Sequence, residues 1–198
     1  MIDHFARYMM IGTHHAGLMT GANGIPATVW AWADGPTGVG NMLYWAASLE
    51  PFAWGAGELY LPQPDGSILL DGYLNPDGSR IYQVAYGALD ETAPPDISEV
   101  HHFEVGAGTL TNSIPGAPTW EYRSSRDIYP PALCSLNPFQ PPAMCVLVDD
   151  FWSSNVSGAD LDVLSYHKDV YYAKGLGPYV IQDHEAGVNL YLHDHWEW

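Results

Sequence analysis

Hydrophobic and polar residues alternate in short runs along this chain, and turns rich in glycine and proline separate the runs. The clearest turn occurs twice, because the sequence Pro-Asp-Gly-Ser at 64–67 recurs at 76–79. Pro-Asp-Gly favours a tight turn in which the glycine adopts a positive φ. We therefore predict that Asp65 and Asp77 open two turns, with positive φ at Gly66 and Gly78.

The two turns flank segments with the composition of strands. Glu58–Leu61, Ile68–Leu74 and Arg80–Tyr86 are rich in aromatic and branched residues and are predicted to form an antiparallel meander. Helix is expected only over Asn41–Leu49 and within the first ten residues. Further strands are expected at Thr28–Trp32, Val100–Val105, Thr119–Arg123, Cys145–Val148, Asp162–Tyr166, Asp169–Ala173, Tyr179–Gln182 and Val188–Trp198.

Many short strands with regular turns and few helices are typical of an all-β domain. We expect a curved antiparallel sheet, either a half-barrel or a barrel, that forms a single domain over residues 1–198. A hydrophobic content of 47% excludes a disordered chain.

The charge of the chain excludes some classes of binding partner. The chain has 23 acidic and 6 basic residues and a formal net charge of −17. Such a charge repels nucleic acids and anionic membrane surfaces, and no apolar run is long enough for a membrane span. Cations, neutral sugars, apolar molecules and other proteins remain as partners, and a homo-oligomer is compatible with the sequence.

Cys134 and Cys145 are the only cysteines, and they bracket a proline-rich segment. An even number of cysteines that closes a short loop predicts a disulfide formed in an oxidising compartment. The alternative is two unrelated buried thiols. With few lysines and many aromatic residues, the composition favours an extracytoplasmic protein whose export signal has been removed.

The segment Tyr171-Tyr172-Ala173-Lys174-Gly175-Leu176-Gly177 resembles the end of bacterial extracytoplasmic lipoprotein-type domains. Those domains are antiparallel half-barrels similar to the lipoprotein-carrier fold. Asp71-Gly72-Tyr73 resembles a hairpin common in the same domains, although the chain has no lipobox cysteine. The resemblance implies binding of a ligand or an envelope partner, and it transfers no catalytic residue.

The last strand carries a candidate metal site. His193, His195 and Glu197 share one face in an alternating strand, and two imidazoles with a carboxylate can bind a divalent metal. His184 or a histidine from the pairs at 14–15 and 101–102 would supply a fourth ligand. The alternative is a solvated polar face of a terminal strand, with no cofactor.

Four tryptophans lie within 25 residues of one another and form the candidate ligand site: Trp30, Trp32, Trp45 and Trp54. Trp30 and Trp32 share a strand face, so their rings would stack on a sugar or line an apolar pocket. Packing in the core is the alternative.

Other catalytic signatures are missing or weak. The chain has no G-x-S-x-G motif and no phosphate-binding loop with a lysine. The pairs Asp149-Asp150 and Asp160-x-Asp162 are candidate carboxylates for glycoside hydrolysis.

Three functions are compatible with these observations. The first is a non-catalytic binding or structural protein with an aromatic-lined concave face. The second is a small β-barrel enzyme of the cyclase or hydro-lyase type that acts on an apolar substrate in its cavity. The third is a metal-dependent enzyme that uses the C-terminal strand. A cavity with convergent polar groups would favour the second function, and an open flat sheet would favour the first.

Overall fold

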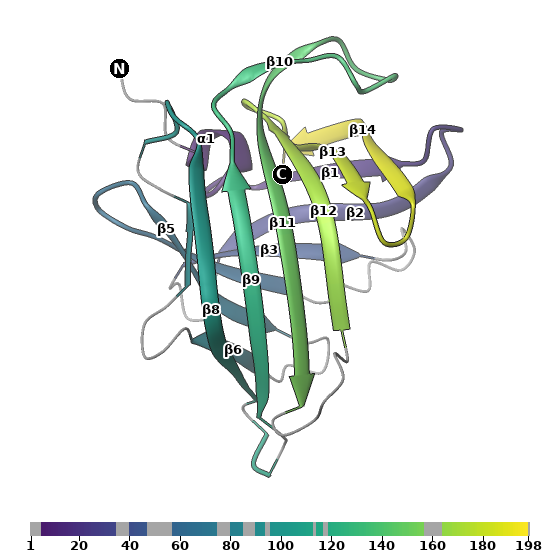
Figure 1. Ribbon diagram of the computed structural model, residues 1–198. Helices are drawn as coiled ribbons and strands as arrows, with labels where there is room; N and C mark the ends of the chain where they lie inside the picture. Colours follow the sequence, from purple (N-terminus) through teal and green to yellow (C-terminus); the bar gives the residue numbers. More distant parts are fainter. Residues whose placement is uncertain are drawn as a thin grey trace.

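The computed structural model describes residues 5–34, 40–46, 57–74, 80–84, 90–93, 96–112, 114–116, 119–156 and 164–197. Within them the chain forms one short helix and an extensive antiparallel sheet (Figure 1). The elements are α1 (Ala6–Met9), β1 (His15–Thr20), β2 (Pro26–Asp34), β3 (Asn41–Ala46), β4 (Gly57–Pro62), β5 (Ile68–Leu74), β6 (Arg80–Val84), β7 (Asp90–Ala93), β8 (His101–Asn112), β9 (Trp120–Ile128), β10 (Ala132–Cys134), β11 (Ala143–Val156), β12 (Leu164–Ala173), β13 (Gly177–Asp183) and β14 (Val188–Glu197). The predicted all-β fold is confirmed.

The strands form one sheet that curves back on itself. The order of the strands is β10-β11-β12-β13-β14-β1-β2-β3-β4-β5-β6-β8-β9. The strand β9 also pairs with β11, on the edge opposite β8, and β7 pairs with β5. Between β5 and β6, the pairs within the described residues are Tyr73–Ile81 and Leu74–Arg80. The sheet is therefore strongly curved without being a uniform barrel.

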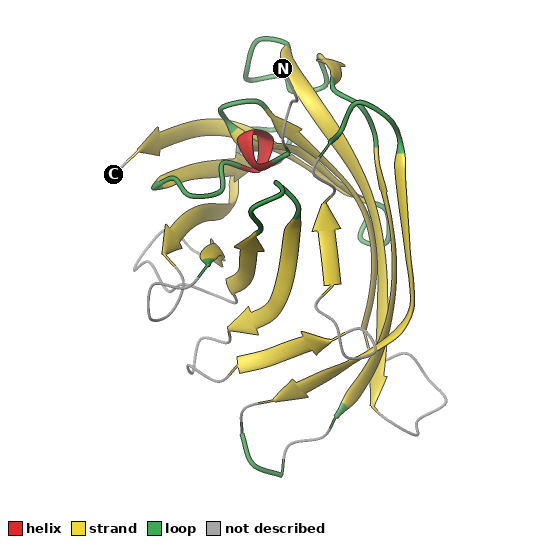
Figure 2. Cartoon of the chain, turned by 90° about the vertical axis from the view of Figure 1, so that its left-hand side faces the viewer, coloured by secondary structure: helices red, strands yellow, loops and turns green. Residues whose placement is uncertain are grey.

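The curvature produces two walls. Figure 1 shows β8, β9, β11 and β12 side by side in front, while β1, β2 and β3 cross behind them at a steep angle. Figure 2 shows the long strands edge-on, with α1 near one end of the space between the walls. Phe5 and Met9 are buried at this end, and the Phe5 ring contacts the Tyr172 ring edge-on at 5.3 Å. No helix among the described residues is long and apolar enough to cross a bilayer.

The meander predicted from the repeated turn is present. β4 pairs with β5, and β5 pairs with β6, all antiparallel. In the first turn Gly66 has a φ of +93°, and the Asp65 carboxylate accepts hydrogen bonds from the backbone and the hydroxyl of Ser67 at 2.9 and 2.7 Å. Gly78 in the second turn lies outside the described residues.

Two local predictions need correction. The helix predicted over Asn41–Leu49 is wrong for its first part, because β3 is a strand that pairs with both β2 and β4. Pairing on both sides satisfies the backbone and overrides the weak helical preference of this segment. The two strands predicted around Tyr166 and Val170 are one strand, β12.

The predicted disulfide is also wrong. Cys134 and Cys145 are both free and buried. In the β10–β11 ladder Cys134 lies opposite Ala143, and Cys145 lies opposite Ala132, so the two cysteines are diagonal neighbours. Diagonal residues are roughly 7–8 Å apart at Cα, which is beyond the usual reach of a disulfide. The two buried thiols are the alternative that the sequence left open.

Trp30 is held in the core by two glycines. A Cβ atom on Gly17 would lie 2.5 Å from the Trp30 ring, and one on Gly177 would lie 2.7 Å from it. The indole therefore occupies the space that side chains on β1 and β13 would fill. Gly177 also has a φ of +76°, as does Gly175, in the turn between β12 and β13.

Candidate functional site

Strands of the front wall carry pairs of adjacent polar residues, and alternation sends one member of each pair inward. The inward members are Arg126 on β9, Asp150 on β11, Lys168 on β12 and Asp183 on β13. Asp150 is in register with both Arg126 and Lys168, and Lys168 is in register with Asp183. These four residues form a row of alternating charge across four neighbouring strands, which we call the inner row.

The best-defined contact of the inner row joins Arg126 and Asp150. Arg126 Nη2 donates a hydrogen bond to Asp150 Oδ2 at 3.2 Å and lies 3.2 Å from Oδ1. Each of the two side chains is only 14% exposed. An ion pair this sheltered is weakly screened by salt, and loss of either partner leaves a charge in a poor solvent.

Glu58 on β4 lies close enough to the inner row for its charge to be affected by Lys168, Asp150 and Arg126. The Tyr60 hydroxyl donates a hydrogen bond to Glu58 Oε2 at 3.0 Å. The β4–β5 register shifts between Glu58 and Tyr60, where Gly72 on β5 has a φ of +110°. Such a bulge changes the direction of a strand locally, and here it lies beside the polar residues of β4.

The inner row and Glu58 line a cavity of about 450 Å³. Apolar and aromatic side chains supply much of the remaining wall. The described lining residues are Phe5, Met9, Thr28, Trp45, Glu58, Tyr60, Leu70, Ser124, Arg126, Val148, Asp150, Trp152, Lys168, Val170, Tyr172, Ile181, Asp183, Ala186, Val188 and Leu190. A cavity of this size, mostly apolar with a few converging polar groups, is typical of small-molecule sites.

The enclosure changes the acidity of two groups. Burial raises the pKa of Glu58, and the positive charge of Lys168 and the Tyr60 hydrogen bond oppose this effect in part. Burial also raises the pKa of Tyr172, and the neighbouring Glu58 raises it further. Glu58 therefore retains its proton more strongly than an exposed glutamate does, and a neutral carboxylic acid can donate a hydrogen bond or a proton.

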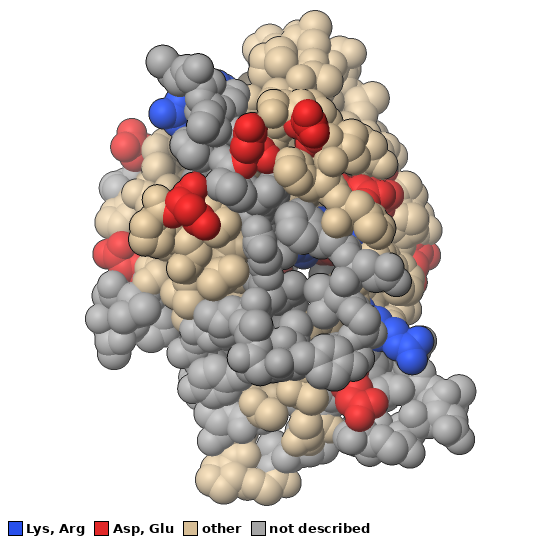
Figure 3. Space-filling model, turned by 60° about the vertical axis from the view of Figure 1, so that its left-hand side comes forward, with Lys and Arg blue, Asp and Glu red and all other residues tan. Residues whose placement is uncertain are grey.

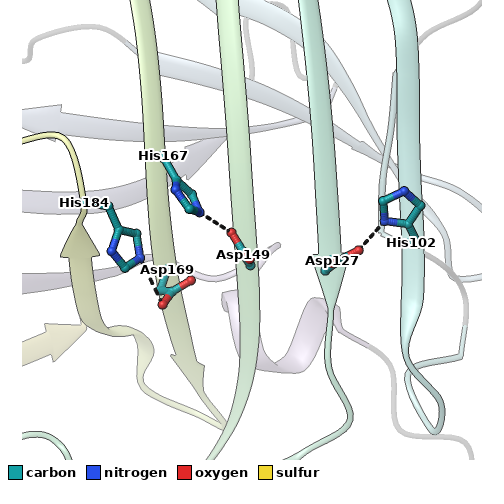
Figure 4. Close-up of polar contacts among 6 residues, drawn as sticks. All are labelled: His102, Asp127, Asp149, His167, Asp169 and His184. Atoms are coloured by element: carbon teal, nitrogen blue, oxygen red, sulfur yellow. Dashed lines mark hydrogen bonds and ion pairs between the residues drawn. The ribbon is translucent and has the colours of Figure 1, made fainter.

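The outward members of the same adjacent pairs form a second row. Asp127, Asp149 and Asp169 are in register on β9, β11 and β12, and each contacts a histidine (Figure 4). The pairs are His102 with Asp127, His167 with Asp149 at 2.8 Å and His184 with Asp169 at 3.2 Å. We call these six residues the outer row. Tyr129 lies near it, and its pKa is raised first by burial and then by the three aspartates.

The structure separates the four predicted tryptophans. Trp45 lines the cavity. Trp30 and Trp32 are fully buried in the core, and Trp32 donates its indole N–H to the backbone oxygen of Met9 at 2.5 Å. Trp54 lies outside the described residues. Trp152, which the sequence analysis did not select, lines the cavity from β11.

The candidate metal ligands lie on β14, away from the cavity lining. His193, His195 and Glu197 are all exposed, and the His193 ring packs against the Phe139 ring at 4.9 Å. In the described part of the chain, no group of three or more His, Cys, Asp and Glu side chains is arranged to hold a metal ion. The metal site stays a prediction from the sequence.

The two candidate carboxylate pairs do not form a site together. Asp149 and Asp150 point to opposite sides of β11, toward His167 and Arg126 respectively. Asp160 and Asp162 lie outside the described residues. The sequence analysis did not identify Arg126 or Glu58 as site residues. The signal for Arg126 was the adjacent charged pair Arg126-Asp127 inside a strand, because one member of such a pair must face inward.

Comparison with known proteins gives little further information. No family model and no curated protein matches the chain. A solved structure from Parabacteroides distasonis ATCC 8503, which carries the working description of a lipoprotein, shares 11% sequence identity with this chain. The match covers 93% of this chain and 95% of the other, with a TM-score of 0.43. The resemblance to lipoprotein-type domains therefore has no support from a sequence family.

Proposed function

We propose that this protein binds a small, partly apolar molecule in the cavity between its two walls. The single observation that carries this proposal is the inner row, in which four charged side chains face an otherwise largely apolar space. Charged groups are costly to shelter from water, and functional sites are where such groups concentrate. The sequence predicted an aromatic-lined concave face, and an internal cavity with Trp45, Tyr60 and Trp152 in its wall is a more specific form of that prediction.

A fluorescence titration tests the proposal. Trp45 and Trp152 line the cavity, so a naphthalene derivative bound in contact with their indole rings should quench their emission. We would titrate the protein with 1-naphthylmethanol, 1-naphthylacetate and 1-naphthylmethyl-trimethylammonium. Saturable quenching by at least one probe supports the proposal, and absence of saturation with all three contradicts it.

A pair of variants locates the bound probe. Val148→Trp places a large side chain in the cavity, whereas Leu147→Trp changes the neighbouring residue, which is absent from the cavity lining. We expect Val148→Trp to abolish binding and Leu147→Trp to preserve it. Val170→Phe is a smaller filling change, should the larger one impair folding. Binding that survives both cavity-filling changes would place the probe elsewhere.

A second candidate function is acid–base catalysis on an apolar substrate, of the cyclase or hydro-lyase type. The observation that favours it is Glu58, a carboxyl with a raised pKa that accepts a hydrogen bond from Tyr60 beside an apolar space. A carboxyl kept neutral can protonate an alkene, an epoxide or a departing hydroxyl. Incubation with geraniol and limonene oxide, followed by mass spectrometry, should then show conversion that Glu58→Gln abolishes. Equal conversion by the variant would contradict this role.

The extracytoplasmic location is part of the proposal as well. It is supported by the acidic, lysine-poor composition and by the segment that resembles lipoprotein-type domains. Fractionation of the source cells tests it, and recovery of the protein in the cytoplasm would contradict it. The same composition supports a small-molecule or protein partner over a nucleic acid.

A further inference from the structure

We propose that the molecule this cavity accepts is a small organic cation, an amine or quaternary ammonium with an apolar body. This inference rests on the proposed binding function and specifies its ligand class. Two features of the cavity support it, the charges in its wall and its aromatic lining, and the proton on Glu58 gives it a measurable consequence.

The charges in the wall leave a place for one positive charge. Among the described lining residues, Arg126 and Lys168 are basic, while Glu58, Asp150 and Asp183 are acidic. The inner row balances itself, because two bases alternate with two acids across four strands. Glu58 is the third carboxyl, and the two basic residues are already matched by Asp150 and Asp183. A bound cation would supply the missing charge, whereas a bound anion would add to the excess.

The apolar part of the wall fits such a ligand as well. Trp45, Tyr60, Trp152 and Tyr172 contribute aromatic side chains to the same cavity. The face of an aromatic ring attracts a cation, and the attraction is stronger where water is displaced. Val148 and Val170 add aliphatic surface for an apolar body. The combination of aromatic surface and a carboxyl group is one that recognises ammonium groups.

The proton on Glu58 gives this recognition a measurable consequence. Burial raises the pKa of Glu58, so the empty cavity favours the neutral acid and avoids the unbalanced charge. An entering cation stabilises the carboxylate, and the Glu58 proton leaves to solvent as the cation takes its place. Besides burial, the groups that shift the pKa of Glu58 are Lys168, Tyr60, Asp150 and Arg126. Glu58 in turn raises the pKa of Tyr172. Binding of a permanent cation therefore releases a proton and tightens as the pH rises.

The field of the whole molecule favours the same ligand class. The net charge of −17 concentrates cations near the surface and speeds their association at low ionic strength. On the face shown in Figure 3, acidic side chains are spread over the described surface.

The experiment compares the three naphthalene probes by isothermal titration calorimetry. The quaternary ammonium probe carries a charge that does not titrate, so any pH dependence comes from the protein. We expect it to bind about tenfold tighter than 1-naphthylmethanol, with 1-naphthylacetate the weakest. Titrations in buffers of different ionisation enthalpy should reveal release of up to about one proton per cation bound.

Two carboxyl-to-amide variants separate a local effect from a global one. Glu58→Gln should weaken the cation about tenfold, abolish proton release and leave the neutral probe unchanged. Asp149→Asn makes the same chemical change in the outer row, one residue from Asp150, and should change neither the affinity for the cation nor the proton release.

The outcomes distinguish this inference from the proposed function. If the neutral or anionic probe binds best in the cavity, the ligand class is wrong, and the binding function stands. If the cation binds best but Glu58→Gln and Asp149→Asn weaken it equally, the preference comes from net charge alone, and the role of the cavity carboxyl is wrong. If no probe binds, the binding function itself is contradicted.

Discussion

The inner and outer rows are built by neighbouring residues of the same strands, yet they occupy opposite environments. Asp150 faces the cavity and pairs with Arg126, each side chain being 14% exposed. Asp149 faces solvent and pairs with His167, with side chains 36% and 43% exposed. One step along β11 therefore changes the surroundings of an aspartate from a sheltered space to a partly exposed face.

The comparison shows that the face of the sheet, more than the residue type, determines how strongly a charged residue interacts with its partners. In the outer row, the histidine of each pair is 43–61% exposed, so water and salt reach the pair, and such pairs contribute little to stability. In the inner row, screening is weaker, so each charge depends on its partners and on any ligand. The predictions below test whether this difference is as large as the geometry indicates.

The largest effect is expected from Arg126→Met. This change leaves Asp150 sheltered without its arginine, although Lys168 remains in register on its other side. We expect a loss of about 3 kcal/mol in the free energy of unfolding, at the lower end for a broken buried pair. Urea denaturation measures it. Arg123→Met on the same strand is the matched control, because Arg123 is exposed, and a similar loss in both variants would remove the distinction between the faces.

A second prediction uses the two lysines of the chain. Lys168 is half-buried between Asp150 and Asp183, whereas Lys174 is exposed in the turn before β13. Acylation requires an amine that the reagent can reach, and Lys168 is the less exposed of the two lysines. We expect acetic anhydride to modify Lys168 about tenfold more slowly than Lys174, as followed by peptide mass spectrometry. Equal rates would show that the inner row is open to solvent.

A third prediction concerns the dependence of stability on pH. Because the pKa of Glu58 is raised in the folded state, the folded protein binds this proton more tightly than the unfolded chain does. Its contribution is fully present below about pH 4.3 and is lost as the pH rises through the folded pKa. Glu58→Gln removes this loss, so the variant should gain stability relative to the parent as the pH rises above about 4.3 and through the folded-state pKa of Glu58. Parallel profiles for the two proteins would show that Glu58 has an ordinary environment.

The smallest effect is expected from His167→Ala in the outer row. The pair with Asp149 is more than one-third exposed on both sides and is screened by solvent. We expect a change below about 0.5 kcal/mol in the free energy of unfolding, reduced further in 1 M salt. A loss comparable to that of Arg126→Met would contradict the comparison between the two rows.

Much of the fold could be predicted from the sequence, because turn residues and the alternation of polar and apolar residues are local signals of strands. Turn chemistry gave the β4–β5–β6 meander and the positive φ of Gly66. Alternation correctly placed Trp30 and Trp32 on one side of β2. The segment that forms β3 was misread because its own residue pattern does not report that it pairs with the preceding β2 and the following β4.

The candidate site was harder to predict, because it depends on the register between strands, which the residue pattern of a single strand does not report. Asp149-Asp150 was noticed as a pair, whereas alternation already required the two carboxylates to face opposite sides. That Asp150 meets Arg126 and Lys168 follows only from the β9–β11 and β11–β12 pairings. The disulfide failed for a related reason, since Cys134 and Cys145 share a hairpin but lie diagonally across it.

Two double-mutant cycles on β11 test the central claim most directly. One cycle combines Arg126→Met with Asp150→Leu, and the other combines His167→Ala with Asp149→Ala, each measured by urea denaturation. The account predicts a coupling energy of about 2 kcal/mol for the inner pair and below about 0.5 kcal/mol for the outer pair. Equal coupling energies for the two pairs would contradict the claim that the inner row is a sheltered, functional arrangement.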